Sequence, residues 1–196
     1  LMVYGIRLSG KKLPQLILPI TTIGYAAPGA VLGIGILVPL AFMDNWIADQ
    51  IFDFTGYDPG LVFTGTAFAI ILAYCVRFFS IAQQTVDGAF GRVSPSLPNA
   101  ARSLGRNKLQ VLWEIYRPIM STSIATALLL VFVDCVKELP ATMLLRPFNF
   151  ETLATRVHVQ ASLEDLPNAA PGAILIVLIG LFAVFLLAKV NTQISN

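Results

Sequence analysis

The stretch LPNAAPGAILIVLIGLFAVFLLA, residues 166–188, contains no Asp, Glu, Lys or Arg. A helix rises about 1.5 Å per residue, so roughly 20 such residues cross the hydrocarbon core of a bilayer. Lipid offers the backbone no hydrogen-bond partners, and a helix satisfies its own. Barrel strands would alternate polar and apolar residues, and residues 174–180 do not. The stretch therefore predicts a transmembrane helix.

Three further charge-free runs extend this interpretation outward, over residues 13–43, 59–76 and 118–133. Together the runs predict an all-α integral membrane protein, a bundle of four transmembrane helices at about 18–42, 61–82, 118–139 and 170–190. Hydrophobic residues make up 56% of the chain and charged residues 12%, against about 25% charged in soluble domains. Mean hydropathy is +0.76. These values exclude a soluble enzyme, a disordered chain and a disulfide scaffold.

The 196 residues fit one transmembrane domain, 1–196, which we expect to be the C-terminal portion of a longer chain. The net charge of +2 is too small to indicate nucleic-acid binding. Cys75 is expected near the inner end of the second helix and Cys135 near the outer end of the third. A disulfide needs Cα atoms within about 7 Å, so the two cysteines are predicted to be unbonded.

Basic residues indicate the orientation of the helices. Three lie in the N-terminal tail, six between Arg77 and Arg117, and Lys189 follows the last run. The opposite segments are acidic, and the first of them, with no basic residue, carries Asp44, Asp49, Asp53 and Asp58. This asymmetry predicts that both termini and the 83–117 loop are cytoplasmic. Trp46 would then lie at the outer interface.

The first predicted helix contains Pro28, Pro39 and the G-x-x-x-G pair Gly29 and Gly33. Two small residues one turn apart allow a neighbouring helix to approach closely. One interpretation is helix packing alone. The other is a flexible or broken helix beside a transport pathway.

A short helix is predicted within the loop at about 84–117. Ser96 is suited to cap it, Pro98 to its first turn and Gly105 to its exit. Ala100, Ala101 and Leu104 would form a small apolar face. This face fits either a knob for a partner's groove or an amphipathic loop lying on lipid, and periodicity favours neither.

The third predicted helix ends with Asp134, Lys137 and Glu138. Spacing of i, i+3 and i+4 places all three on one face, about 30 Å from Pro118. They would form either a polar gate lining a pathway or a local ion pair, for which Asp134 and Lys137 are better placed. Carboxylates suit a hard cation such as ferric iron. We expect replacement of Glu138 to impair uptake and replacement of Lys137 to reduce stability.

The sequence contains no convincing catalytic or metal-binding motif. Gly5–Lys12 nearly fits the phosphate loop G-x-x-x-x-G-K-[ST], but Lys12 stands where a hydroxyl would bind magnesium. Juxtamembrane positive charge explains this segment better. The single His158 is expected to be an interfacial residue rather than a ligand or base. We therefore predict no catalytic residue, no metal ligand and no enzymatic activity.

The loop nevertheless resembles a known family. Asn99, Ala100, Ala101, Gly105, Ile115 and Pro118 match the spacing of E-A-A-x3-G-x9-I-x-L-P, the pattern of permease subunits of binding-protein-dependent ABC importers. Asn99 replaces the glutamate and Arg117 the leucine. Residues 137–155, 25–29 and 76–78 resemble the ferric-iron branch. Thiamine, phosphonate and polyamine permeases are close relatives.

This resemblance implies a multi-pass permease of the bacterial inner membrane that passes substrate, with ferric iron the first expectation, from a periplasmic binding protein to the cytoplasm. ATP and magnesium would bind a separate cytoplasmic ATP-binding subunit, and this chain would bind no cofactor. A second permease half or copy would complete the pathway. The residues expected to contact the ATP-binding subunit are Asn99, Ala100, Ala101, Arg102, Ser103, Leu104, Gly105, Ile115 and Pro118.

One rival from another class is a proton-coupled secondary transporter in which Asp134 and Glu138 carry protons. A broken first helix would suit such a carrier. The loop pattern argues against it, because a proton-driven carrier has no need of a docking helix.

Overall fold

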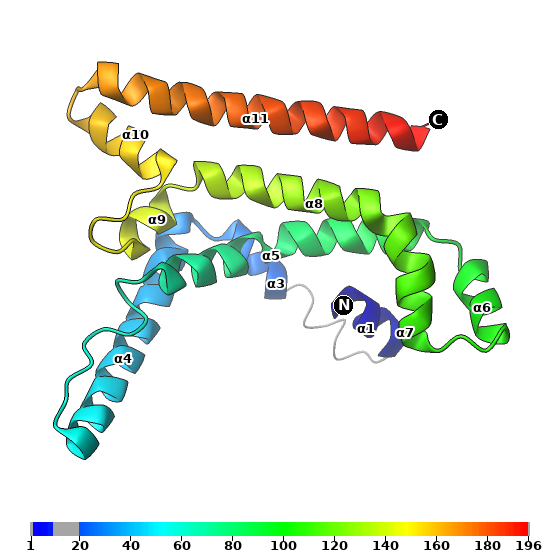
Figure 1. Ribbon diagram of the computed structural model, residues 1–196, viewed down its shortest axis with the longest axis horizontal. Helices are drawn as coiled ribbons and strands as arrows, with labels where there is room; N and C mark the ends of the chain where they lie inside the picture. The colour runs from blue at the N-terminus through cyan, green and yellow to red at the C-terminus, as the bar shows by residue number, and fades with distance from the viewer. Residues whose placement is uncertain (1, 10–19, 196) are drawn as a thin grey trace.

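The computed structural model describes residues 2–9 and 20–195, and within these ranges the chain is helical with no strand. Figure 1 shows the helices in chain order. Their bounds are α1 (Met2–Ser9), α3 (Ile20–Ala26), α4 (Gly29–Thr55), α5 (Ala67–Arg92), α6 (Ser96–Ser103), α7 (Lys108–Val111), the π-helix η1 (Leu112–Tyr116), α8 (Arg117–Lys137), α9 (Pro140–Leu145), α10 (Leu153–Ser162) and α11 (Leu166–Ser195).

Four helical segments are long and apolar enough to cross a membrane: α4, α5, the continuous segment Lys108–Lys137, and α11. The predicted all-α membrane fold with four spans is therefore confirmed. Short helices connect them, including the predicted one near residue 100 and α10, which follows the cap residue Thr152.

The first span differs most from its prediction at 18–42. Residues 18 and 19 lie outside the described ranges, and the rest is divided into α3 and α4 at Ala27 and Pro28. Pro28 is extended, with φ −55° and ψ 138°, and it has no N–H to continue the helix. The helix is thus broken, as one of the two interpretations of this segment expected. After it, α4 continues through Pro39 to Thr55 and stops at Gly56, whose φ is 69°.

Asp44 explains why the end of this span was misplaced. The prediction put Asp44, Asp49 and Asp53 in a loop, but all three lie in α4. Asp44 is fully buried, and its carboxylate accepts bonds from Val62 N, Phe63 N, Thr64 N and Thr64 Oγ1. A buried carboxylate with such partners need not end a helix, because its lone pairs are satisfied.

The second span, predicted at 61–82, runs from Ala67 to Arg92 and is capped by the side chain of Thr66. Its charges have partners within the protein: Arg92 Nη2, for example, donates to Ser123 Oγ at 2.8 Å. The connection to the third span consequently covers residues 93–107, which is shorter than the loop predicted at about 84–117.

Gly29 and Gly33 form the contact between α4 and α9. A Cβ atom on Gly29 would lie 2.6 Å from Glu138 Oε1, and one on Gly33 would lie 3.0 Å from Leu144 Cδ1. Both glycines are buried. The neighbour that approaches both glycines is α9 of the same chain.

The bundle has two distinct ends in Figure 1. Helices α5 and α8 pack side by side, and α11 packs on α8 and α10. Helices α1 and α6 and the C-terminal end of α11 lie toward one end, whereas α9 and α10 lie toward the other. Helix α4 diverges from the other long helices.

Both cysteines are free, as predicted. Their relative placement was predicted wrongly. Cys75 lies two residues before Arg77, which contacts Glu138 just after α8. Cys75, in the N-terminal half of α5, and Cys135, near the C-terminus of α8, therefore lie toward the same end of the bundle.

Candidate functional site

The short helix α6 begins one residue earlier than predicted. Pro95 occupies the N-cap position and no side chain caps the helix; the Ser96 hydroxyl instead lies 2.8 Å from that of Ser94. Asn99 is therefore the fourth residue of the helix. Its backbone carbonyl accepts from Ser103 Oγ at 3.2 Å.

Gly105 closes α6 as predicted. Its φ is 84°, a left-handed conformation that β-branched residues resist. Gly105 N donates to Arg102 O at 2.9 Å, and Arg106 N donates to Ala101 O at 3.0 Å. These two bonds form a Schellman motif, which ends the helix abruptly. The chain can then turn directly toward α7.

One side of α6 is unpacked within the described residues. Leu97 is 48% exposed and Leu104 is 84% exposed, and between them Ala100 is exposed and Ala101 half-buried. The i, i+3, i+4, i+7 spacing gathers these four side chains into one apolar face, which we call the α6 face. Pro98, on the other side, is buried. Figure 1 shows α6 outside the bundle.

Helix α1 secures the chain that follows α6. Tyr4 stacks on Phe90 with ring centroids 5.9 Å apart and meets Tyr116 edge-on at 5.4 Å. Its hydroxyl donates to Lys108 O at 2.6 Å. Burial raises the pKa of the Tyr4 phenol, which keeps the donor protonated. This aromatic cluster joins α1, the end of α5 and the start of the third span.

Near its start, after α7, the third span contains a π-helical turn. Pro118 has no N–H to bond the carbonyl of Glu114, which an α-helix would require. The helix widens instead, and Arg117 N donates to Leu112 O, five residues back. Ile115 lies within this turn and Pro118 in the first turn of α8. The two residues that complete the family pattern therefore shape the base of the third span.

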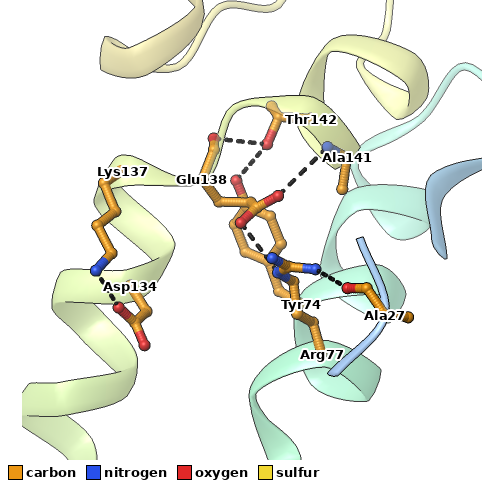
Figure 2. Close-up of polar contacts among 8 residues, drawn as sticks. All are labelled: Ala27, Tyr74, Arg77, Asp134, Lys137, Glu138, Ala141 and Thr142. Atoms are coloured by element: carbon orange, nitrogen blue, oxygen red, sulfur yellow. Dashed lines mark hydrogen bonds and ion pairs between the residues drawn. The ribbon is translucent and has the colours of Figure 1, made fainter. Parts of the chain in front are cut away.

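A polar site lies at the opposite end of the bundle, where three helices meet (Figure 2). Arg77 Nε on α5 is 3.0 Å from Glu138 Oε2, and Arg77 Nη1 donates to Ala27 O at 2.9 Å. The Nε–H is not aligned with the carboxylate, so this contact is an ion pair rather than a hydrogen bond. One guanidinium thus joins the break before α4 to the break after α8.

Tyr74 and Thr142 extend this site, which we call the polar joint. Thr142 Oγ1 donates to Glu138 O at 3.1 Å, and the Tyr74 hydroxyl donates to Thr142 Oγ1 at 2.6 Å. Thr142 is fully buried. The joint therefore holds α9 against α5 and α8 through side-chain hydrogen bonds.

The three charges at the end of α8 do not share one face as predicted. Glu138 is the residue after the helix, with φ −70° and ψ 119°, so it leaves helical spacing and turns toward Arg77. Asp134 and Lys137 form the pair that their spacing favoured, with Nζ 2.6 Å from Oδ1. Figure 2 shows this pair on the other side of the helix end.

Sequence reasoning did not predict the contacts that Arg77, Asp44 and Tyr4 make between helices and loops. Arg77 is the only charge between Asp58 and Asp87, and an isolated charge in an apolar run signals a buried partner. It was counted instead among the basic residues that indicate the cytoplasmic side, although the predicted helix at 61–82 contains it. His158 is exposed on α10. Of the rejected phosphate loop, Gly5–Ser9 is helical, and residues 10–12 lie outside the described ranges.

Comparison with known proteins matches residues 2–195 to the model of the family "binding-protein-dependent transport system inner membrane component". The chain belongs to this family of multi-pass membrane permeases. The predicted resemblance to ABC importer permeases is confirmed, including the likeness to ferric-iron permeases.

Three curated relatives illustrate the range of transport systems to which the chain is similar. The chain is 34% identical over 124 residues to the Fe(3+)-transport system permease protein FbpB 2 of Haemophilus influenzae, covering 63% of this chain and 24% of that protein. It is 27% identical over 157 residues to the ferric transport system permease protein FbpB of Actinobacillus pleuropneumoniae, covering 79% and 21%. It is 27% identical over 166 residues to a Salmonella typhimurium protein named for 2-aminoethylphosphonate transport, PhnV, covering 85% and 56%.

The chain thus spans about a quarter of the length of these ferric permeases and about half that of the phosphonate permease. The comparisons identify a transporter subunit of this permease family.

Proposed function

We propose that this chain is part of the permease of an ATP-driven importer, and that the α6 face docks on a cytoplasmic ATP-binding subunit. The observation that carries the proposal is the exposed apolar face of Leu97, Ala100, Ala101 and Leu104. It lies on a helix held between two spans and closed by Gly105. Membership of a binding-protein-dependent family supports a soluble partner on each side of the membrane.

The proposed mechanism uses the rigid parts around α6. The Schellman motif fixes the exit of α6, and the Tyr4 cluster joins the end of α5 to the start of the third span, between which α6 lies. Movement of a docked ATP-binding subunit would be transmitted to these two helices, which pack side by side. Nucleotide binding would thereby bias inward-open and outward-open states, a coupling of two sites through a two-state element. ATP and magnesium stay on the partner subunit.

In the proposed orientation, both termini and α6 face the cytoplasm of a bacterium. A periplasmic binding protein delivers substrate at the end that carries α9 and α10, and a second permease half or copy encloses the path. The common end of α1, α6 and the end of α11 in Figure 1 supports this assignment. Removing the intramembrane Arg77 from the count of basic residues leaves the charge asymmetry in place.

Ferric iron is the proposed substrate, because several similar proteins are named for ferric transport. An aminoalkylphosphonate is the second candidate, since similarity to the phosphonate permease extends over 85% of this chain. Uptake of radioactive iron and of labelled 2-aminoethylphosphonate by the same reconstituted importer separates the two. Transport of phosphonate but not iron would reject the ferric assignment.

The docking role is tested with Gly105→Val in the full-length permease. A β-branched residue at φ 84° breaks the exit of α6, so we expect loss of affinity for the purified ATP-binding subunit and loss of uptake, with normal membrane insertion. Gly60→Val is the matched control, because Gly60 has a similar φ of 66° but lies in the loop before α5. Equal affinity of the Gly105→Val and wild-type permeases for the ATP-binding subunit would reject docking through α6.

A further inference from the structure

An apolar groove of about 380 Å³ lies where α5, η1 and the start of α8 meet. Its walls include Val86 from α5, Leu112 from η1, and Met120 and Ile124 from α8. The π-helical turn widens the helix at this point, and π-bulges occur frequently at functional sites. The groove has the size and polarity to hold most of one hydrocarbon chain.

Among the described residues that line this groove, Arg117 is the only cation. Its guanidinium lies over the Trp113 ring, 5.0 Å from the centroid. Among the residues whose side chains the structure describes, none forms an ion pair with Arg117. The nearby carboxylate of Glu114 is engaged elsewhere, 3.1 Å from Arg106 Nε. Arg117 therefore has donors available for an anion.

The position of this pair matches the headgroup region of a bilayer. Arg117 precedes Lys137 by one full membrane thickness, about 30 Å of helix. Trp113, 53% exposed, has the amphipathic ring favoured at a membrane interface. Arginine is also the residue at which this chain departs from the leucine of the family pattern. A cation with an adjacent apolar groove is complementary to a lipid phosphate and its acyl chain.

We propose that this groove binds one anionic phospholipid, with an acyl chain between α5 and α8 and the phosphate on Arg117. The site is distinct from the α6 face and does not depend on the transported substrate. Because the lipid would contact both the end of α5 and the start of α8, its binding would stiffen the base from which α6 projects.

The test uses the full-length permease assembled with its partner subunits and purified in detergent. Native mass spectrometry measures binding of phosphatidylglycerol and of phosphatidylcholine with identical acyl chains. We expect phosphatidylglycerol to bind about fivefold more tightly, since one arginine near a lipid surface contributes about 1 kcal/mol. Arg117→Gln should abolish this preference, and Arg117→Lys should retain it.

Two further variants separate the groove from general surface charge. Ile124→Trp fills the groove and should weaken binding of both lipids. Arg156→Gln removes an exposed charge from α10 and should change neither affinity. The proposal is overturned if Arg117→Gln keeps the preference, if inorganic phosphate alone displaces the lipid, or if the assembled permease retains no lipid because another helix covers the groove.

Discussion

Arg77 in α5 and Glu138 just after α8 form a buried ion pair, with Nε 3.0 Å from Oε2 and side-chain exposures of 17% and 8%. The same guanidinium donates a hydrogen bond to Ala27 O, just after α3. One side chain therefore stabilises two helix breaks at once. Breaking a buried pair leaves an uncompensated charge, which is more costly than losing an exposed pair.

Glu138→Gln should destabilise the protein. The change keeps the size of the side chain but leaves the Arg77 charge in a buried site without its counter-ion, at a cost of about 3–5 kcal/mol. A clear fall in melting temperature in detergent is the expected result, with any loss of uptake following from it. This reverses the expectation from helical spacing, which assigned the transport effect to Glu138 and the stability effect to Lys137.

Asp134→Asn is the matched control for that experiment. It also removes one carboxylate from the end of α8, but its partner Lys137 is 62% exposed. Solvent screens such a pair, so the cost should be below about 1 kcal/mol. If the two variants had the same melting temperature and Glu138→Gln still lost uptake, Glu138 would belong to the pathway and not to the polar joint.

Comparison of the predicted and observed helices shows which parts of the fold the sequence could predict. Apolar runs without charge located four spans, because the bilayer imposes length and composition on any helix that crosses it. The same rule placed the ends of α4 and α5 too early, because it assigns charged residues such as Asp44 and Asp87 to loops, whereas both lie inside these helices. Asp44 and Arg77 lie inside helices since their partners come from residues 62–64 and from Glu138, and such pairings require the tertiary fold.

Local signals at α6 were more reliable. Gly105 adopts the positive φ that its position predicted, because a Schellman exit depends only on neighbouring residues. The prediction that Asp134, Lys137 and Glu138 share one face was wrong for the opposite reason. The spacing rule assumes continuous helix, and the chain leaves the helix at Glu138.

Gly29→Ala should loosen the contact between α4 and α9. The new Cβ would meet Glu138 Oε1 at 2.6 Å, so the ion pair or α4 must move, and overpacking of this kind costs about 1–3 kcal/mol. Gly35→Ala on the same helix meets nothing within 4 Å and should gain up to about 1 kcal/mol of helix propensity. Opposite shifts in melting temperature are expected. Equal shifts would contradict the close contact at Gly29.

Leu104→Glu should weaken docking of the ATP-binding subunit without affecting the fold. Leu104 is 84% exposed, and substitutions at such sites usually change stability by less than about 0.5 kcal/mol. Within a binding face, however, an unpaired charge should cost about 2 kcal/mol, or roughly 30-fold in affinity. Leu163→Glu, at a position 74% exposed beside α10, is the control. Pull-down of purified ATP-binding subunit measures both.

Tyr4→Phe should loosen α1 by a small amount. It retains the rings stacked on Phe90 but removes the 2.6 Å bond to Lys108 O, worth about 1 kcal/mol. Burial raises the pKa of the Tyr4 phenol above its usual value of 10.0. The contribution of the bond is therefore complete below about pH 10 and is lost only as pH rises through the raised pKa. Hydrogen exchange of the α1 amides should increase in the variant at pH 7, and identical exchange would show that the bond does not secure α1.

Asp44→Asn should disrupt the entry into α5. Both carboxylate oxygens of Asp44 accept two bonds each, from Val62 N and Phe63 N on Oδ1 and from the amide and hydroxyl of Thr64 on Oδ2. Asparagine offers one oxygen, and its amide would face donors on the other side. Each buried donor left unsatisfied costs about 1–3 kcal/mol. Asp49→Asn, exposed on the same helix, should have little effect. Faster proteolysis of the 56–66 loop in Asp44→Asn alone, with a lower melting temperature, is the expected result, and matching behaviour of the two variants would show that this carboxylate does not hold the loop.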